Sequence, residues 1–71
     1  MPKPNNDKIF VLRYKDSHEI VKRVNGHPVY VSDYGSPTVS LENAALFESS
    51  IEAYRRAAYY ELDKDVIAKE I

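Results

Sequence analysis

The two histidines of this sequence are the candidate anchors of a metal site. Pairing of strands could bring His18 and His27 near Asp16 or Glu19, which would supply carboxylate ligands. Structural zinc sites use four ligands drawn mostly from cysteine and histidine, and the chain has no cysteine. We therefore expect two solvated turn residues and no metal.

A serine, a histidine and a carboxylate also stand side by side, at Ser17, His18 and Glu19. A catalytic triad is assembled by the fold from separate parts of a chain, whereas neighbouring side chains in a turn point in different directions. Asp63 and Asp65 form a carboxylate pair, which a solvated helix end explains. With two glycines in the whole chain, no phosphate-binding glycine loop can be built. We expect no enzyme and no cofactor.

The strongest candidate site is a set of arginine and tyrosine side chains. Arg55, Arg56 and Tyr59 fall on the exposed face of an expected helix, and arginine and tyrosine are enriched in binding hot spots. A plainer interpretation is a solvated face on which Glu52 pairs with one of the arginines. Tyr34 stands in a loop and either makes a contact there or folds back over a thin core.

The elements that position these residues begin with strands. The sequence predicts a flexible tail over Met1–Asp7 and a first strand over Lys8–Lys15, which is rich in β-branched and aromatic residues. Glu19–Val24 is predicted as a second strand. Asn25 and Gly26 then favour a type I′ hairpin, and His27–Ser32 is predicted as the returning strand.

The second half of the sequence predicts a loop, a helix and a last strand. Asp33–Thr38 reads as a loop, followed by one helical turn capped by Ser40 and a brief extended segment over Ala44–Phe47. Ser49 and Glu52 fit a capping box for a helix that runs to about Leu62. The expected buried arc of this helix contains Ile51, Ala53, Tyr54, Ala57, Ala58, Tyr60 and Leu62. Asp65–Ile71 is predicted as a strand.

These elements define an α+β fold in which a three-strand antiparallel meander and a C-terminal strand form a small sheet, with one main helix on one face. The chain has 71 residues, a net charge of −1 and 44% hydrophobic residues, which indicates a single domain over residues 8–71. A dedicated nucleic-acid binder usually carries a basic excess, and this chain does not. The longest apolar run is too short for a membrane span, so we expect a cytoplasmic protein.

The segment Pro28–Ile71 resembles a pattern found in small uncharacterised proteins of phages and prophages of Gram-positive bacteria. The pattern here comprises the strand Val29–Val31, the loop Ser32–Pro37, the turn Ser40–Ala44, then Phe47, Ser49, Glu52, Ala53 and Val66–Ala68. These residues are structural ones. The resemblance implies an accessory phage-type protein, which would act in the cytoplasm of the host cell if it is phage-encoded, and it transfers no catalytic or binding positions.

Three functions remain open at this point. The leading hypothesis is a non-enzymatic protein-interaction module that acts on a host or phage protein. The second is a nucleic-acid-associated protein that adds Lys22 and Arg23 to the Arg55, Arg56 and Tyr59 patch. The third is a small enzyme with an unrecognised site. If the last strand lies at a sheet edge, two copies could also pair through it, so monomer and homodimer are both left open.

Overall fold

An antiparallel sheet of four strands organises the protein. The computed structural model describes residues 8–71, so the expected tail over residues 1–7 lies outside the described part. The strands are β1 (Phe10–Tyr14), β2 (Tyr30–Val31), β3 (Pro37–Thr38) and β4 (Val66–Glu70), in the order β3-β2-β1-β4. The helices are α1 (Glu19–Arg23) and α2 (Ser50–Tyr59), with a 3₁₀ turn η1 (Leu41–Asn43). The predicted α+β class, with one main helix, is confirmed.

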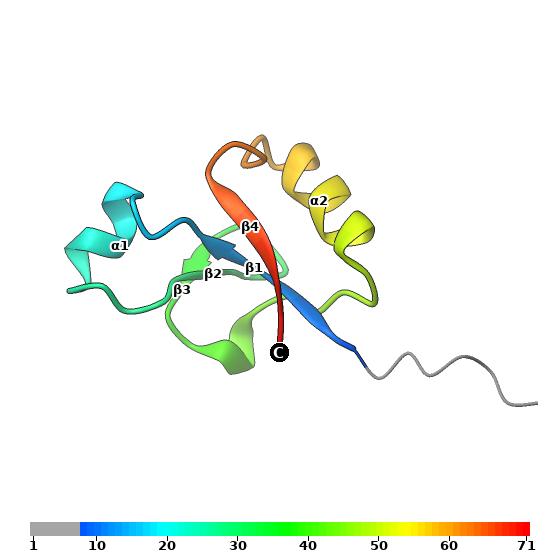
Figure 1. Ribbon diagram of the computed structural model, residues 1–71, viewed down its shortest axis with the longest axis horizontal. Coiled ribbons are helices and arrows are strands. Elements are labelled where there is room, and N and C mark those ends of the chain that lie inside the picture. Colours follow the sequence, from blue (N-terminus) through cyan, green and yellow to red (C-terminus); the bar gives the residue numbers. More distant parts are fainter. Residues whose placement is uncertain (1–7) are drawn as a thin grey trace, which may run out of the picture.

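The first and last strands form the longest pairing in the sheet. β1 pairs with β4 along its full length, from Phe10 opposite Glu70 to Tyr14 opposite Val66. β1 is central, as its apolar residues on both faces predicted: Val11 and Leu12 are both fully buried. Figure 1 shows β1 and β4 crossing the middle of the molecule, with α1 and α2 at opposite ends.

The prediction of a strand over Glu19–Val24 is wrong, because this segment forms α1. His18 caps the helix, since its Nδ1 accepts a hydrogen bond from the Ile20 backbone N–H at 3.1 Å. Glu19 and Arg23 form an ion pair at 2.9 Å, the i,i+4 spacing that supports a helix. In the helix Val21 faces the core, which strand alternation would have placed outward.

The predicted hairpin at Asn25 and Gly26 is also wrong, although both residues adopt the backbone conformation that such a turn requires. Both residues have positive φ, 60° and 82°, as a type I′ turn would require. Here they end α1: the Gly26 N–H donates to the Val21 carbonyl at 2.9 Å and the Asn25 N–H to Lys22 at 3.2 Å. These two bonds define a Schellman motif, which also needs a left-handed residue.

The remaining strands differ from the prediction in length and place. Within the predicted strand His27–Ser32, only Tyr30–Val31 is β2, paired at Tyr30 with Arg13 of β1. The predicted loop Asp33–Thr38 ends in β3, whose Pro37 lies opposite Val31. The meander is therefore β1-β2-β3, with α1 inserted where its second strand was expected.

The segment between β3 and α2 follows its prediction closely. η1 comes directly after Ser40, although the Ser40 side chain makes no capping hydrogen bond. Instead the Ser40 backbone N–H donates to the Thr38 hydroxyl at 3.1 Å. The extended segment after η1 forms isolated bridges from Ala44 to Ser32 and from Phe47 to Phe10, which confirms its extended character.

The predicted cap of α2 is confirmed, its predicted end is wrong, and its predicted buried arc is right in part, because Ala53, Ala57, Tyr60 and Leu62 pack on the core. The Ser49 Oγ accepts a hydrogen bond from the Glu52 backbone N–H at 3.2 Å. The helix ends at Tyr59, because Glu61 takes a positive φ of 61° and the Leu62 N–H returns to the Ala57 carbonyl at 2.8 Å. Two helix residues, Ala53 and Ala57, are buried, while Ile51 is 65% exposed.

Replacing Ser49 by alanine is expected to lower the free energy of unfolding by about 1 kcal/mol, because the Glu52 N–H loses its acceptor. In a domain of this size that corresponds to a fall in Tm of roughly 4–8 °C, measurable by circular dichroism. Ser50→Ala is the matched control, because Ser50 is already inside the helix. Equal effects of the two changes would contradict the cap at Ser49.

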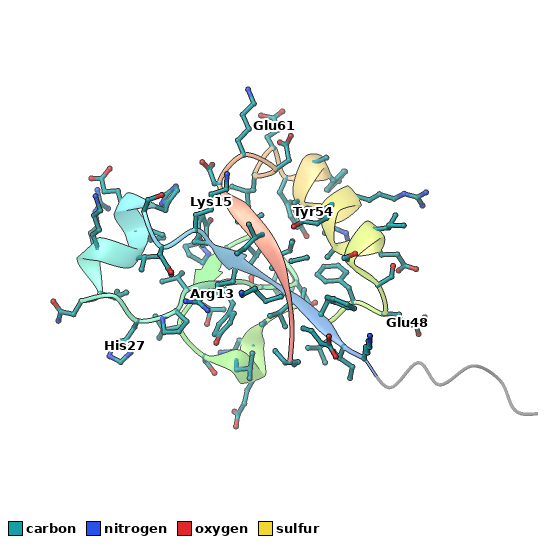
Figure 2. The ribbon with its side chains drawn as sticks, viewed as in Figure 1. Arg13, Lys15, His27, Glu48, Tyr54 and Glu61 are labelled. Carbon is teal, nitrogen blue, oxygen red and sulfur yellow. The ribbon has the colours of Figure 1, made fainter. Side chains whose placement is uncertain are left out.

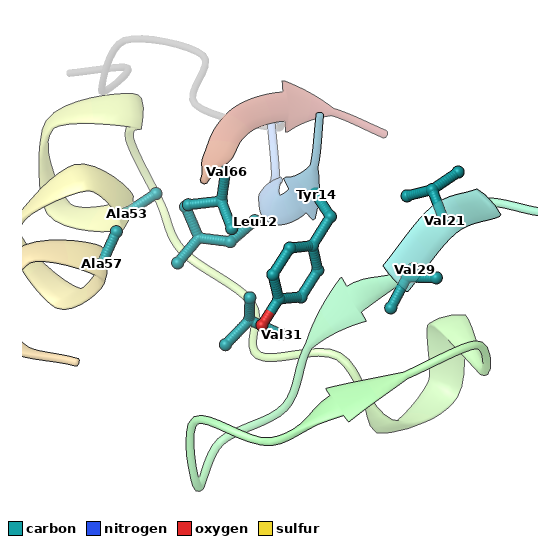
Figure 3. Packing of buried hydrophobic residues seen from close by; sticks show 8 residues of the cluster. All are labelled: Leu12, Tyr14, Val21, Val29, Val31, Ala53, Ala57 and Val66. Carbon is teal, nitrogen blue, oxygen red and sulfur yellow. The ribbon is translucent and has the colours of Figure 1, made fainter. Parts of the chain in front are cut away.

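The core lies between the sheet and both helices. Ala53 and Ala57 let α2 approach Leu12 of β1 and Val66 of β4 closely, as Figure 3 shows. At the other end of the same cluster α1 contributes Val21, which packs with Val29 and Tyr14. The buried cluster consists of Leu12, Tyr14, Val21, Val29, Val31, Ala53, Ala57 and Val66.

Candidate interaction site

Three of the four predicted patch residues lie together on the exposed face of α2. Arg55, Arg56 and Tyr59 line one shallow surface hollow with Glu52, one helical turn earlier. Tyr59 is the most exposed of the aromatic residues on this helix, at 79%. The helical spacing predicted this arrangement, and the structure places these residues as predicted. We call Glu52, Arg55, Arg56 and Tyr59 the α2 patch.

The arginines of the α2 patch have no ion pair with any residue in 8–71. In the described residues Arg13 pairs with Asp16 and Arg23 with Glu19, and the His18 ring lies near the Asp65 carboxylate, an ion pair only when the histidine is protonated. The expected pairing of Glu52 with Arg55 or Arg56 is not among them. Both guanidinium groups therefore present their donors to solvent or to an incoming acceptor, beside an exposed aromatic ring.

Tyr60 supports this patch, a role that sequence reasoning did not find. Its ring lies edge-on to that of Tyr59, with the centroids 5.4 Å apart, and the Arg56 guanidinium carbon lies 6.0 Å from its centroid. The Tyr60 hydroxyl donates a hydrogen bond to the Asp33 carbonyl at 2.5 Å. Tyr60 thus joins the end of α2 to the turn after β2.

Tyr34 belongs to the same turn but to a different hollow. The Ser32 hydroxyl orders the turn by accepting from the backbone N–H groups of Tyr34, at 3.3 Å, and Ser36, at 3.2 Å. Tyr34 is 90% exposed, so it does not fold back over the core. Its hollow is lined by Ser32, Asp33, Thr38, Glu42 and Asn43. The structure therefore groups Arg55, Arg56 and Tyr59, and leaves Tyr34 in a separate hollow, in the turn that Tyr60 contacts at Asp33.

The basic residues proposed to extend the patch for nucleic acid lie elsewhere. Lys22 and Arg23 belong to α1, and Figure 1 places α1 and α2 at opposite ends of the sheet. Arg23 is also paired with Glu19. The structure does not bring these two sets of cations together into one continuous surface.

The residues considered for metal binding or catalysis take structural positions. His18 caps α1 through Nδ1, while its Nε2 lies 3.7 Å from the Asp65 carboxylate. Glu19 is paired with Arg23, and His27 is exposed in the segment before β2. Within residues 8–71, no three His, Cys, Asp or Glu side chains converge as metal ligands.

The ring of His18 packs at 4.9 Å from that of Tyr14, a buried tyrosine whose pKa is shifted. Burial raises the pKa of the Tyr14 phenol above 10.0, and the nearby charge of Asp65 acts in the same direction. This holds Tyr14 in its neutral form, as suits a ring packed in the core.

Comparison with known proteins found no relative of this chain. No protein-family model, no curated protein and no solved structure matches this chain. Among the helices of residues 8–71, none is long and apolar enough to cross a membrane.

Proposed function

We propose that this protein is a non-enzymatic interaction module that binds another protein through the α2 patch. The observation that carries the proposal is that Arg55 and Arg56 are unpaired in the described chain and flank a Tyr59 ring that is 79% exposed. Arginine forms bidentate hydrogen bonds with carboxylates, so the surface best suited to this patch is an acidic one.

The placement of these side chains on a rigid element supports the same proposal. α2 is capped at Ser49 and held against the sheet by two fully buried alanines. The Tyr60 ring contacts the Tyr59 ring edge-on and lies 6.0 Å from the Arg56 guanidinium carbon. A site with ordered aromatic and arginine side chains loses less conformational entropy on binding than a mobile one.

The biological setting of the proposal rests on the resemblance of Pro28–Ile71 to small phage and prophage proteins. We propose an accessory protein that acts in the cytoplasm of the bacterial host on a host or phage protein. The absence of a metal, a cofactor and a catalytic residue is part of this proposal.

Site-specific photo-cross-linking in the bacterial host tests the α2 patch. A photo-reactive phenylalanine analogue at Tyr59 is expected to capture a discrete protein, whereas the same analogue at Lys22 on α1 is not. Arg55→Glu together with Arg56→Glu should reduce the capture at least about tenfold, because hot-spot side chains contribute about 2 kcal/mol or more. Equal capture at both positions, or capture that the two charge reversals leave unchanged, would contradict the proposal.

Titration with labelled single- and double-stranded oligonucleotides tests the alternative that the α2 patch binds nucleic acid. We expect no binding at physiological salt. Binding that weakens steeply as salt increases, and that requires Arg55 and Arg56, would instead assign the patch to nucleic acid.

A further inference from the structure

The two edges of the sheet are protected very differently. β3 ends one side with two residues, one of which is Pro37, and a short proline-containing strand is a poor template for pairing. β4 ends the other side with five residues and no proline. The last strand of the chain thus lies at a sheet edge. It is the strand whose pairing with another chain must be either prevented or used.

The backbone groups of β4 alternate between its partner strand and the open edge. At the two ends of the β1–β4 pairing, the Asp65 carbonyl accepts from the Lys15 N–H at 3.0 Å and the Ile71 N–H donates to the Ile9 carbonyl at 2.8 Å. The strand alternation consequently directs the N–H and carbonyl groups of Val66, Ala68 and Glu70 outward.

Two of these outward N–H groups are already occupied within the chain. The Val66 N–H donates to the Leu62 carbonyl at 3.2 Å. The Ala68 N–H, in the middle of the strand, donates to the Tyr54 hydroxyl at 3.1 Å. Figure 2 shows Tyr54 on α2 beside β4, and its side chain is 43% exposed at this edge.

We propose that the outer edge of β4 is a pairing surface for a second copy of this chain, and that the Tyr54 hydroxyl keeps it closed. While the hydroxyl occupies the Ala68 N–H the protein is a monomer, and without it two copies pair edge to edge. This inference is independent of the α2 patch.

The sequence of β4 is suited to pairing with itself. A two-fold axis at Ala68 places each Ala68 N–H against the carbonyl of the other copy's Ala68. The same register sets Val66 opposite Glu70 and Ile67 opposite Lys69, so no like charges stand directly opposite each other. Tyr54 therefore occupies the central donor of the self-complementary arrangement.

Tyr54→Phe tests the proposal because it removes the hydroxyl and keeps the ring. We expect exchange of the Ala68 amide hydrogen to increase about tenfold at low concentration, since a hydrogen bond is lost. Across the micromolar to millimolar range, sedimentation equilibrium should show the variant rising from 8.2 kDa towards twice that mass. The unaltered protein and Tyr30→Phe, the same change on β2, should stay at 8.2 kDa.

A second variant separates edge pairing from association caused by unfolding. Adding Ala68→Pro to Tyr54→Phe removes the N–H that pairing requires, while proline at an outward-facing edge position leaves the bonds to β1 intact. This double variant should return to a monomer. A dimeric unaltered protein, a monomeric Tyr54→Phe, or a double variant that still associates would each overturn the proposal.

Discussion

Leu12→Ala is expected to remove a large part of the stability of this protein. Leu12 is fully buried at the centre of β1, in the cluster that also contains Ala53 and Val66. Replacing a buried leucine by alanine costs about 2–5 kcal/mol, because burial is lost and a cavity remains. By the usual stability per residue, a domain of this length has roughly 4–10 kcal/mol in total.

Urea denaturation followed by circular dichroism measures this effect. Leu46→Ala is the matched control: it makes the same chemical change at a residue that is 58% exposed, where we expect less than about 0.5 kcal/mol. Similar losses at the two positions would mean that the core does not lie between α2 and β1.

The second large effect is expected at Gly35, which lies against Tyr60. A Cβ at Gly35 would come within 2.8 Å of the Tyr60 ring, and its φ is +84°. Gly26 has nearly the same φ, +82°, but a Cβ there would meet nothing within 4 Å. Gly26→Ala should therefore cost about 1 kcal/mol from backbone strain alone. Gly35→Ala should cost about 1–3 kcal/mol more, because the ring must move.

The consequence of Gly35→Ala should reach the α2 patch. Moving the Tyr60 ring breaks its contacts with Tyr59 and Arg56 and its hydrogen bond to Asp33. Thermal melts of Gly26→Ala and Gly35→Ala, together with NMR chemical shifts of Tyr59, distinguish backbone strain from a steric clash with Tyr60. If the two variants lose the same stability and leave Tyr59 unshifted, the contact between Gly35 and Tyr60 does not support the patch.

The elements that the sequence predicted correctly are those specified by local signals. β1 is rich in apolar and aromatic residues, β4 begins with the β-branched pair Val66 and Ile67, and Ser49 with Glu52 forms a local cap. α1 could not be predicted in this way, because its apolar residues fit both an alternating strand and one face of a short helix. Histidine is outside the usual N-cap residues, and Asn25 with Gly26 serves a hairpin and a helix end equally well.

The candidate site likewise contains residues that local spacing identifies and residues that only the fold brings together. Helical spacing was sufficient to group Arg55, Arg56 and Tyr59, because they lie on one surface helix. The tyrosines that act across the fold could not be assigned from spacing. Tyr60 reaches Asp33, 27 residues away, and Tyr54 reaches Ala68, 14 residues away. Helical spacing places both tyrosines on a buried arc, yet their hydroxyls form hydrogen bonds with backbone groups of other segments.

The pairing of β1 with β4 also determines how the sheet responds to force. Ile9 and Ile71 lie side by side, joined by the hydrogen bond from the Ile71 N–H to the Ile9 carbonyl. Tension applied at these two residues loads the inter-strand bonds one after another from that end. The strands then peel apart like a zipper, and no step has to break many bonds at once. Unfolding under tension should begin with separation of β4, which uncovers Leu12 and exposes the core.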